Sequence, residues 1–157
     1  HLANRVQRLT LVTQNVDGLH QRAGSPHVLE YHGNILRDRC TVEQVLAERS
    51  EDSRTSALPR CAACGGLLRP DVVWFGEMIP RGALVEADAA AADCDAFLSI
   101  GTSSLVYPAA GLAETAFRRG VPVIEVNPNA TDLSPHADVV LQGPAGRILP
   151  ELLRALA

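Results

Sequence analysis

Amide and carboxylate side chains follow a short apolar run near the start of the chain. The stretch LTLVTQNVDGLH (9–20) opens like a buried strand and becomes polar at Gln14, Asn15 and Asp17. Asn, Asp and Gly are common turn residues, so an ordinary turn is one interpretation. A lining for a polar ligand is the other, and the rest of the chain decides between them.

His32 supplies a titratable side chain shortly after this stretch. It precedes Gly33 in the segment LEYHG (29–33). Imidazole titrates near neutrality and is the commonest general base, although a lone histidine is more often a surface or satisfied residue. His32 is therefore a candidate base whose role depends on what binds beside it.

The composition is that of a globular protein and excludes several classes. The 157 residues are 46% hydrophobic and 20% charged, with a net charge of -4, and the basic residues form no stripe, so we expect no nucleic-acid binding. No apolar run reaches the roughly 18 residues of a membrane helix. Four cysteines without an export signal favour a reducing, cytoplasmic location. The chain starts without Met, and we expect it to be a fragment.

Apolar runs alternate with helical patterns along the chain. Strands are expected over 9–12, 70–76, 95–101, 121–127 and 137–143, and helices over 82–94, 108–120 and 147–157. Pro108 is expected at the first helical position and Pro150 in a first turn. The alternation predicts an α/β fold, a Rossmann-like parallel sheet with helices on both faces.

A polar segment interrupts this alternation. Residues 40–64 are polar and hold three of the four cysteines, which predicts a small Cys-containing module over 37–69. Residues 1–36 and 70–157 then form the Rossmann-like domain.

Small and polar residues follow four of the predicted strands. They are TQNVDG, GTSS, NPN and QGPAG. Ligands of open parallel sheets bind beyond the carboxyl ends of the strands, where Gly and Ser/Thr allow close approach to phosphate and ribose. A nucleotide is the expected ligand, with four ordinary turns as the alternative.

The ordered set of motifs resembles a known family, the sirtuins. The set comprises TQNVDGLHQRAG (13–24), LEYHG (29–33), Cys40, CAAC (61–64), RPDVVWFGE (69–77), IGTSS (100–104) and VN (126–127). The resemblance implies an NAD-dependent protein lysine deacylase, a deacetylase or desuccinylase. NAD would be the co-substrate, and acyl-lysine proteins or peptides the partners. The acyl group would pass to ADP-ribose with release of nicotinamide. The family's first strand and Gly-rich loop would lie upstream of residue 1, so we expect the isolated chain to catalyse little.

The resemblance also implies residue roles. His32 would take a proton from the ribose hydroxyls. Asp17 would orient the nicotinamide carboxamide, and Asn15 would position its ribose. The cofactor-binding set is Gln14, Asn15, Val16 and Asp17 on the nicotinamide side, with Gly101, Thr102, Ser103, Asn127, Pro128, Asn129 and Ala145 on the adenosine side. Turn chemistry remains the alternative for Ser103, Ser104 and Asn129.

The segment VVWFGE (72–77) resembles the family's substrate-peptide edge. Val73, Trp74, Phe75 and Gly76 would contact the acyl-lysine peptide, which adds as a strand. Trp74 resembles the version found in desuccinylase and demalonylase types. A core strand with two aromatic residues is the alternative.

The cysteines form an incomplete zinc pattern. CAAC (61–64) is matched by CTVE (40–43), so Glu43 stands where the family usually has its second Cys. Two alternatives are open. Either zinc is held by Cys40, Cys61 and Cys64 with Glu43 or water, or the zinc site is lost and the segment is stabilised by packing. A disulfide is disfavoured in a reducing compartment. Cys94 is expected to be a buried free thiol.

Three rival functions remain open at this point. The chain is alternatively a catalytically impaired NAD or ADP-ribose-binding module, which the missing Gly-rich loop favours and the intact His32 and Asp17 oppose. An ADP-ribosyltransferase is not separated from a deacylase by sequence. A zinc-ribbon module that binds protein or nucleic acid is opposed by the negative net charge.

Overall fold

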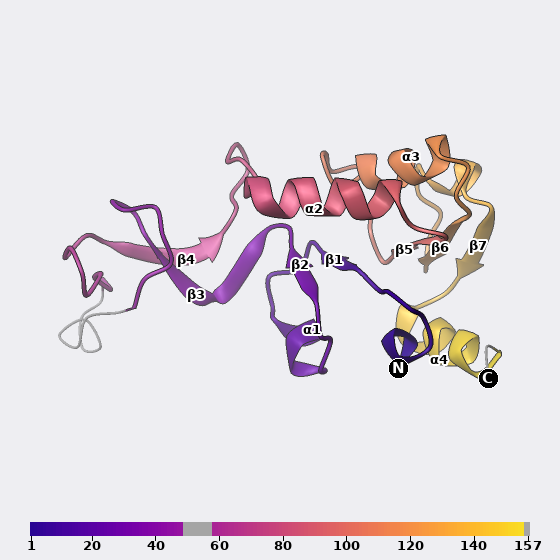
Figure 1. The fold of residues 1–157 in the computed structure, drawn as a ribbon, viewed down its shortest axis with the longest axis horizontal. Helices are drawn as coiled ribbons and strands as arrows, with labels where there is room; N and C mark the ends of the chain where they lie inside the picture. Colours follow the sequence, from indigo (N-terminus) through magenta and orange to yellow (C-terminus); the bar gives the residue numbers. More distant parts are fainter. Residues whose placement is uncertain (49–57, 156–157) are drawn as a thin grey trace. The chain divides into compact units, whose positions relative to one another are not determined.

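The protein is described by a computed structural model over residues 1–48 and 58–155 (Figure 1). The chain divides into two compact units. Unit 1 comprises His1–Thr10 and Leu84–Ala157, and unit 2 comprises Leu11–Ala83. The predicted Cys module over 37–69 includes residues 49–57, which lie outside the described residues.

Unit 1 is built on a three-stranded parallel sheet. β5 (Phe97–Ile100), β6 (Val123–Asn127) and β7 (Val139–Gln142) pair in that order, with Ile100 opposite Val126 and Asn127 opposite Gln142. In Figure 1, α3 (Gly111–Arg118) lies above the strands and α4 (Ala145–Ala155) below them, and both contact β6. The predicted parallel strands over 95–101, 121–127 and 137–143 are confirmed.

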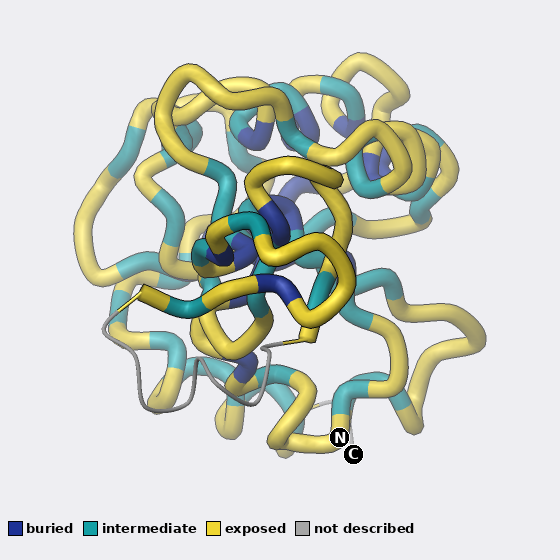
Figure 2. The backbone as a smooth tube through the Cα atoms, turned by 90° about the vertical axis from the view of Figure 1, so that its left-hand side faces the viewer, coloured by how far each residue is buried: buried dark blue, intermediate teal, exposed yellow. Residues whose placement is uncertain are grey.

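The core of unit 1 rests on small aliphatic side chains. Val123 and Val126 of the central strand are fully buried, and α3 buries Leu112, Ala113 and Ala116. Figure 2 shows the buried positions in dark blue as short stretches of a largely exposed tube. With so few aromatic residues in the sequence, most of the buried positions of unit 1 are Ala or Val.

The predicted helix starts need two corrections. The helix expected over 82–94 is α2 (Arg81–Ala92), but α3 begins at Gly111 and not at Pro108. Pro108 lies in a preceding turn, where the Ala110 amide donates to Val106 O (2.9 Å). Pro150 lies inside α4 and not in its first turn, because Pro144 O accepts from the amides of Arg147 and Ile148 and starts the helix earlier.

Unit 2 contains two separate strand pairs. β1 (Leu11–Thr13) and β2 (Val28–Glu30) are parallel, whereas β3 (Gly33–Cys40) and β4 (Leu68–Val72) are antiparallel. A four-residue helix, α1 (Leu19–Arg22), follows the TQNVDG turn. The remaining elements are the short 3-10 helices η1 (Leu2–Asn4) and η3 (Ser134–His136) of unit 1.

The expected buried strand over 70–76 is wrong in extent and environment. β4 ends at Val72 and pairs with β3, a strand that the mixed sequence GNILRDRC does not reveal. A two-stranded ribbon leaves the following residues uncovered, so Trp74 is 57% exposed and Phe75 is 100% exposed. The alternative of a core strand with two buried aromatic residues is therefore also wrong.

A helix that crosses a membrane must be both long and apolar. Over the described ranges 1–48 and 58–155, every helix is too short or too polar to cross a bilayer.

Candidate functional site

The TQNVDG segment is an ordered turn at the carboxyl end of β1. The Asn15 amide donates to Thr13 Oγ1 (3.1 Å), and the Leu19 amide donates to Asp17 Oδ1 (2.9 Å). The second bond is an Asx-type turn that leads into α1. These polar side chains therefore do form a turn, and that turn lies directly beside His32.

The His32 imidazole is held by the backbone of this turn. Its Nδ1 lies 3.1 Å from the carbonyl oxygen of Gln14. A carbonyl oxygen only accepts, so Nδ1 carries the hydrogen and Nε2 of the neutral ring is left with its lone pair. The Tyr31 ring meets the imidazole edge at a centroid distance of 5.9 Å. The geometry therefore presents Nε2 as the basic atom of a half-buried histidine.

The backbone around His32 is held by the residue that follows β4 and by the TQNVDG turn. His32 O accepts from the Val73 amide (3.0 Å), and Val16 O accepts from the Ile35 amide (2.9 Å). Gly33 has φ +80°, and a Cβ there would lie 2.0 Å from Asp71 O. Only glycine fits this close approach, so the HG pair is a packing requirement as well as a motif.

An ion-pair network extends from the end of β2 along the β3–β4 ribbon. Arg37 lies 2.6 Å from Glu30 and 3.1 Å from Asp71, and Arg39 lies 2.7 Å from Asp71. Asn34 donates to Glu30 Oε1 (2.5 Å). Asp71 is 7% exposed, so its charge is balanced inside the protein by these two arginines. Sequence reasoning did not single out these residues, since a strand pairing absent from the sequence pattern brings them together.

The segment after β4 is folded around Arg69. Arg69 donates to both carboxylate oxygens of Glu77 (2.9 and 3.0 Å) and to Val72 O (2.8 Å), and its guanidinium lies 4.7 Å from the Trp74 ring centroid. The Trp74 amide donates to Glu77 Oε2 (3.0 Å). This backbone bond and the Arg69 charge hold the pKa of Glu77 below its ordinary value. These contacts of Arg69 with Glu77, Val72 and Trp74 clamp the following segment into a tight turn. That turn carries Val73, Trp74, Phe75 and Gly76.

Unit 1 gathers the other predicted cofactor residues at the carboxyl ends of its strands. Asn127 Nδ2 donates to Thr102 O (2.7 Å), which ties the end of β6 to the loop after β5. The Gly143 amide donates to Asn127 O (3.0 Å), close to Ala145, the first residue of α4. Gly101 has φ +65°, a conformation that favours glycine. Gly101, Thr102, Asn127 and Ala145 thus belong to one edge of one sheet.

The turn interpretation of Ser103 has direct support, whereas at Asn129 the turn is formed by the side chain of Asn127. Ser103 Oγ accepts from the Leu105 amide (3.4 Å), and the Asn129 amide donates to Asn127 Oδ1 (3.3 Å). The carbonyl of Pro128 accepts from Gln142 Nε2 (3.3 Å). These bonds shape the loops and leave the Asn129 side chain exposed.

Three cysteines converge at the end of the β3–β4 ribbon. The sulfur atoms of Cys40, Cys61 and Cys64 all lie within 4.8 Å of one another, with Cys40 and Cys61 buried and Cys64 exposed. The Glu43 amide lies 3.4 Å from Cys40 Sγ and lowers the pKa of that thiol. The pKa of Cys64 is instead raised, because the lowering effect of the Gly66 amide is outweighed by hydrogen bonding with Cys40 and by burial. It is the convergence of the three sulfur atoms that fits three of the four ligands of a zinc site.

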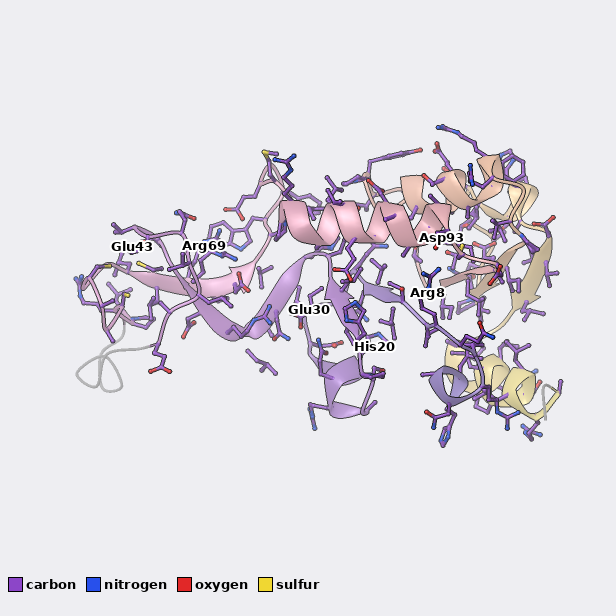
Figure 3. The ribbon with its side chains drawn as sticks, in the orientation of Figure 1. Arg8, His20, Glu30, Glu43, Arg69 and Asp93 are labelled. Atoms are coloured by element: carbon purple, nitrogen blue, oxygen red, sulfur yellow. The ribbon has the colours of Figure 1, made fainter. Side chains whose placement is uncertain are left out.

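Glu43 does not complete this cluster. Among the described residues, the group of mutually close ligand atoms contains the three sulfurs and not the Glu43 carboxylate. Glu43 is exposed and is labelled in Figure 3 at the end of the ribbon that carries the sulfurs. Its backbone amide, and not its side chain, contacts Cys40.

Cys94 departs slightly from its prediction. It is a free thiol just beyond α2, as expected, but it is half-buried and not buried. It donates to Ala91 O (3.4 Å), and burial raises its pKa.

Comparison with known proteins identifies the family. The model of the Sir2 family matches residues 1–108. This chain belongs to the Sir2 family. It is 46% identical over 162 residues to the "NAD-dependent protein deacylase" of Methylococcus capsulatus, covering 99% of this chain and 64% of that protein. The resemblance to sirtuins found in the sequence is thereby confirmed.

Solved structures of Sir2 proteins share the fold. A mutant Sir2 homologue in complex with 2′-O-acetyl ADP ribose matches with a TM-score of 0.88 and 42% identity, over 98% of this chain and 62% of that one. A Sir2–p53 peptide–NAD+ complex matches with a TM-score of 0.88 and 30% identity, over 98% and 65%. This chain therefore spans less than two thirds of the length of these relatives.

Proposed function

We propose that this chain is part of an NAD-dependent protein lysine deacylase in which His32 is the general base. The orientation of His32 carries the proposal: Gln14 O holds Nδ1 and leaves Nε2 to accept a proton from a ribose hydroxyl. NAD supplies ADP-ribose as the acyl acceptor and releases nicotinamide. The deacylase names of Sir2-family relatives support the same reaction.

The cofactor subsites follow from the two polar edges. Gln14, Asn15, Val16 and Asp17 are proposed to hold the nicotinamide and its ribose, Asp17 facing the carboxamide. Gly101, Thr102, Ser103, Asn127, Pro128, Asn129 and Ala145 are proposed to hold the adenosine part. The NAD and ADP-ribose complexes of relatives support NAD as co-substrate.

The Arg69-clamped turn is the proposed substrate segment. An acyl-lysine peptide would bond along the backbone of Val73 to Gly76, and the exposed Phe75 side chain would contact the acyl-lysine. The peptide in the complex of a relative supports this class of partner. The free thiols of all four cysteines support a reducing, cytoplasmic location.

Zinc is proposed to have a structural role in a module formed by residues 37–69. Cys40, Cys61 and Cys64 would hold the ion, which would cross-link the two ends of this segment. A fourth position is left to water or to a rotated Glu43 side chain. The division into this module and a Rossmann-like domain (1–36 and 70–157) is part of the proposal.

Product analysis tests the proposed reaction. The complete protein that carries this chain would be incubated with NAD and acetyl-lysine or succinyl-lysine peptide, and the products separated by mass spectrometry. Deacylated peptide with acyl-ADP-ribose is the expected result. An ADP-ribosylated peptide or protein would instead indicate a transferase, and ADP-ribose binding without either product would indicate a binding module.

A further inference from the structure

Glu125 is a buried carboxylate in the middle of β6. Its side chain is 1% exposed, although most acidic residues lie at the surface. Thr131 Oγ1 donates to Glu125 Oε1, and Ser134 Oγ donates to Oε2 (2.5 Å). Both carboxylate oxygens are thus capped by hydroxyls from the segment that follows the strand.

Burying the Glu125 carboxylate lowers the stability of the fold, so a purely structural role does not explain it well. Within the described part of the chain, no lysine, arginine or histidine forms an ion pair with Glu125, so neutral hydroxyls alone compensate its burial. A buried carboxyl needs all of its hydrogen bonds, and an apolar side chain at a central strand position is usually no less stable. A fully satisfied polar cluster does, however, fix one conformation of the segments it joins.

The cluster fixes the loop that follows β6. Successive side chains of a strand alternate between its faces, so Glu125 and Asn127 lie on the same face of β6. Asn127 holds the start of the loop, through Thr102 O and the Asn129 amide. Glu125 holds its end, where the Thr131 amide also donates to Ser134 Oγ (2.8 Å).

We propose that Glu125 is a positioning residue for the adenosine subsite. Through Thr131 and Ser134 it holds residues 128–134 in the conformation that presents Asn127 and Asn129 to the ribose hydroxyls of an adenosine diphosphate moiety. The inference rests on the proposed function, because it assigns a role within the same NAD site. It places Glu125 outside contact with the nucleotide and outside the chemistry at His32.

Binding of ADP-ribose to the complete protein separates this role from a general effect on folding. Glu125→Ala is expected to weaken ADP-ribose binding by about tenfold, which is the effect of losing about one hydrogen-bonded contact. It should raise KM for NAD similarly, with kcat and the KM for acyl-peptide changed less than about twofold. Glu125→Gln keeps an acceptor for one hydroxyl, and a hydroxyl can accept from its amide, so this variant should recover most of the affinity.

Asp138, an exposed residue just before β7, provides a control carboxylate that bonds to the same strand as Glu125. Its carboxylate accepts from the Val123 amide (2.8 Å) at the amino end of β6, away from the polar edge. Asp138→Ala removes the acceptor of this bond and should lower the melting temperature without changing ADP-ribose affinity. If Glu125→Ala is too unstable to measure, Ser134→Ala replaces it and is expected to weaken ADP-ribose binding severalfold.

The outcomes distinguish this inference from the proposed function. If the unmodified protein binds ADP-ribose and Glu125→Ala or Ser134→Ala binds it equally well, the positioning role alone is overturned. Equal losses of ADP-ribose affinity in Glu125→Ala and Asp138→Ala also overturn it, since they would reflect stability. Failure of the unmodified protein to bind ADP-ribose at all overturns the proposed function itself.

Discussion

The Nδ1 atom of His32 lies 3.1 Å from the backbone oxygen of Gln14. This one contact joins the catalytic candidate to the amide-rich turn, and it uses the main chain and not the Gln14 side chain. The histidine is therefore oriented by the path of the backbone after β1. A substitution of the Gln14 side chain alone leaves this bond available.

Gly33 is expected to tolerate no side chain. Gly33→Ala would place a Cβ 2.0 Å from Asp71 O in a backbone with φ +80°. We expect a loss of about 2–4 kcal/mol in the free energy of unfolding, the sum of backbone strain and displaced strand backbone. Urea unfolding of the two proteins measures it.

Gly24 is a control that separates the cost of backbone strain from the cost of a clash between the new Cβ and its neighbours. It has φ +83°, but nothing lies within 4 Å of a Cβ built there. Gly24→Ala should cost only about 1 kcal/mol, the strain of a non-glycine residue in the left-handed region. Equal costs at the two positions would contradict the claim that β4 closes over Gly33.

The cysteine cluster is expected to bind zinc through three thiolates. Cys61→Ser should abolish stoichiometric zinc in the purified protein, whereas Cys94→Ser should leave it unchanged, because Cys94 lies outside the cluster. Glu43→Cys would supply a fourth thiolate and should strengthen retention of zinc against a chelator by about tenfold or more. Zinc content and chelator competition measure both effects.

Two results would contradict this account of the metal. Zinc content that survives Cys61→Ser would place the ion elsewhere. A Glu43→Ala variant that loses zinc as completely as Cys61→Ser would show that the Glu43 carboxylate is a full ligand, which its exposed position does not predict.

The turn that carries Trp74 is expected to depend on pH through Glu77. The folded pKa of Glu77 is lowered by the Trp74 amide and by Arg69, from about 4.3 in an unfolded chain. A lowered carboxyl pKa stabilises the fold at pH above the unfolded value, and that stability is lost as pH falls through the folded pKa. Below about pH 4, the turn should therefore loosen.

Trp74 reports on this turn directly, because it is the only tryptophan of the chain. Its fluorescence should change below about pH 4 while far-UV circular dichroism stays constant. Glu77→Gln should show the low-pH fluorescence already at neutral pH. The same pH profile of Trp74 fluorescence in the unmodified protein and in Glu77→Gln would contradict the role assigned to Glu77.

The sequence predicted the parallel sheet of unit 1 well, for a physical reason. Buried strands need continuous apolar runs, and FLSI and VIEVN stand out as such runs. VVLQ is also a continuous apolar run, although Val139 and Val140 of this edge strand are exposed. β3 did not stand out, because its ribbon is paired on one side and carries Arg37, Asp38 and Arg39. Its partner β4 was consequently assigned to the wrong kind of sheet.

The site was predicted at the level of residue types and not of contacts. The sequence pointed to His32 and to the polar strand ends, but a bond to a backbone carbonyl leaves no trace in side-chain chemistry. Arg69 and Glu77 were within a quoted motif, yet their pairing depends on a turn. Glu125 looked like one polar residue in an apolar run, and only the fold brings Thr131 and Ser134 to it.

Nicotinamide release by the complete protein and by its His32→Ala variant tests the central claim most directly. With NAD and an acetyl-lysine or succinyl-lysine peptide, we expect peptide-dependent release that falls by about 100-fold or more in the variant, the usual contribution of a general base. NAD binding, measured by calorimetry, should persist in the variant. Release at the same rate in both proteins would contradict the role assigned to His32.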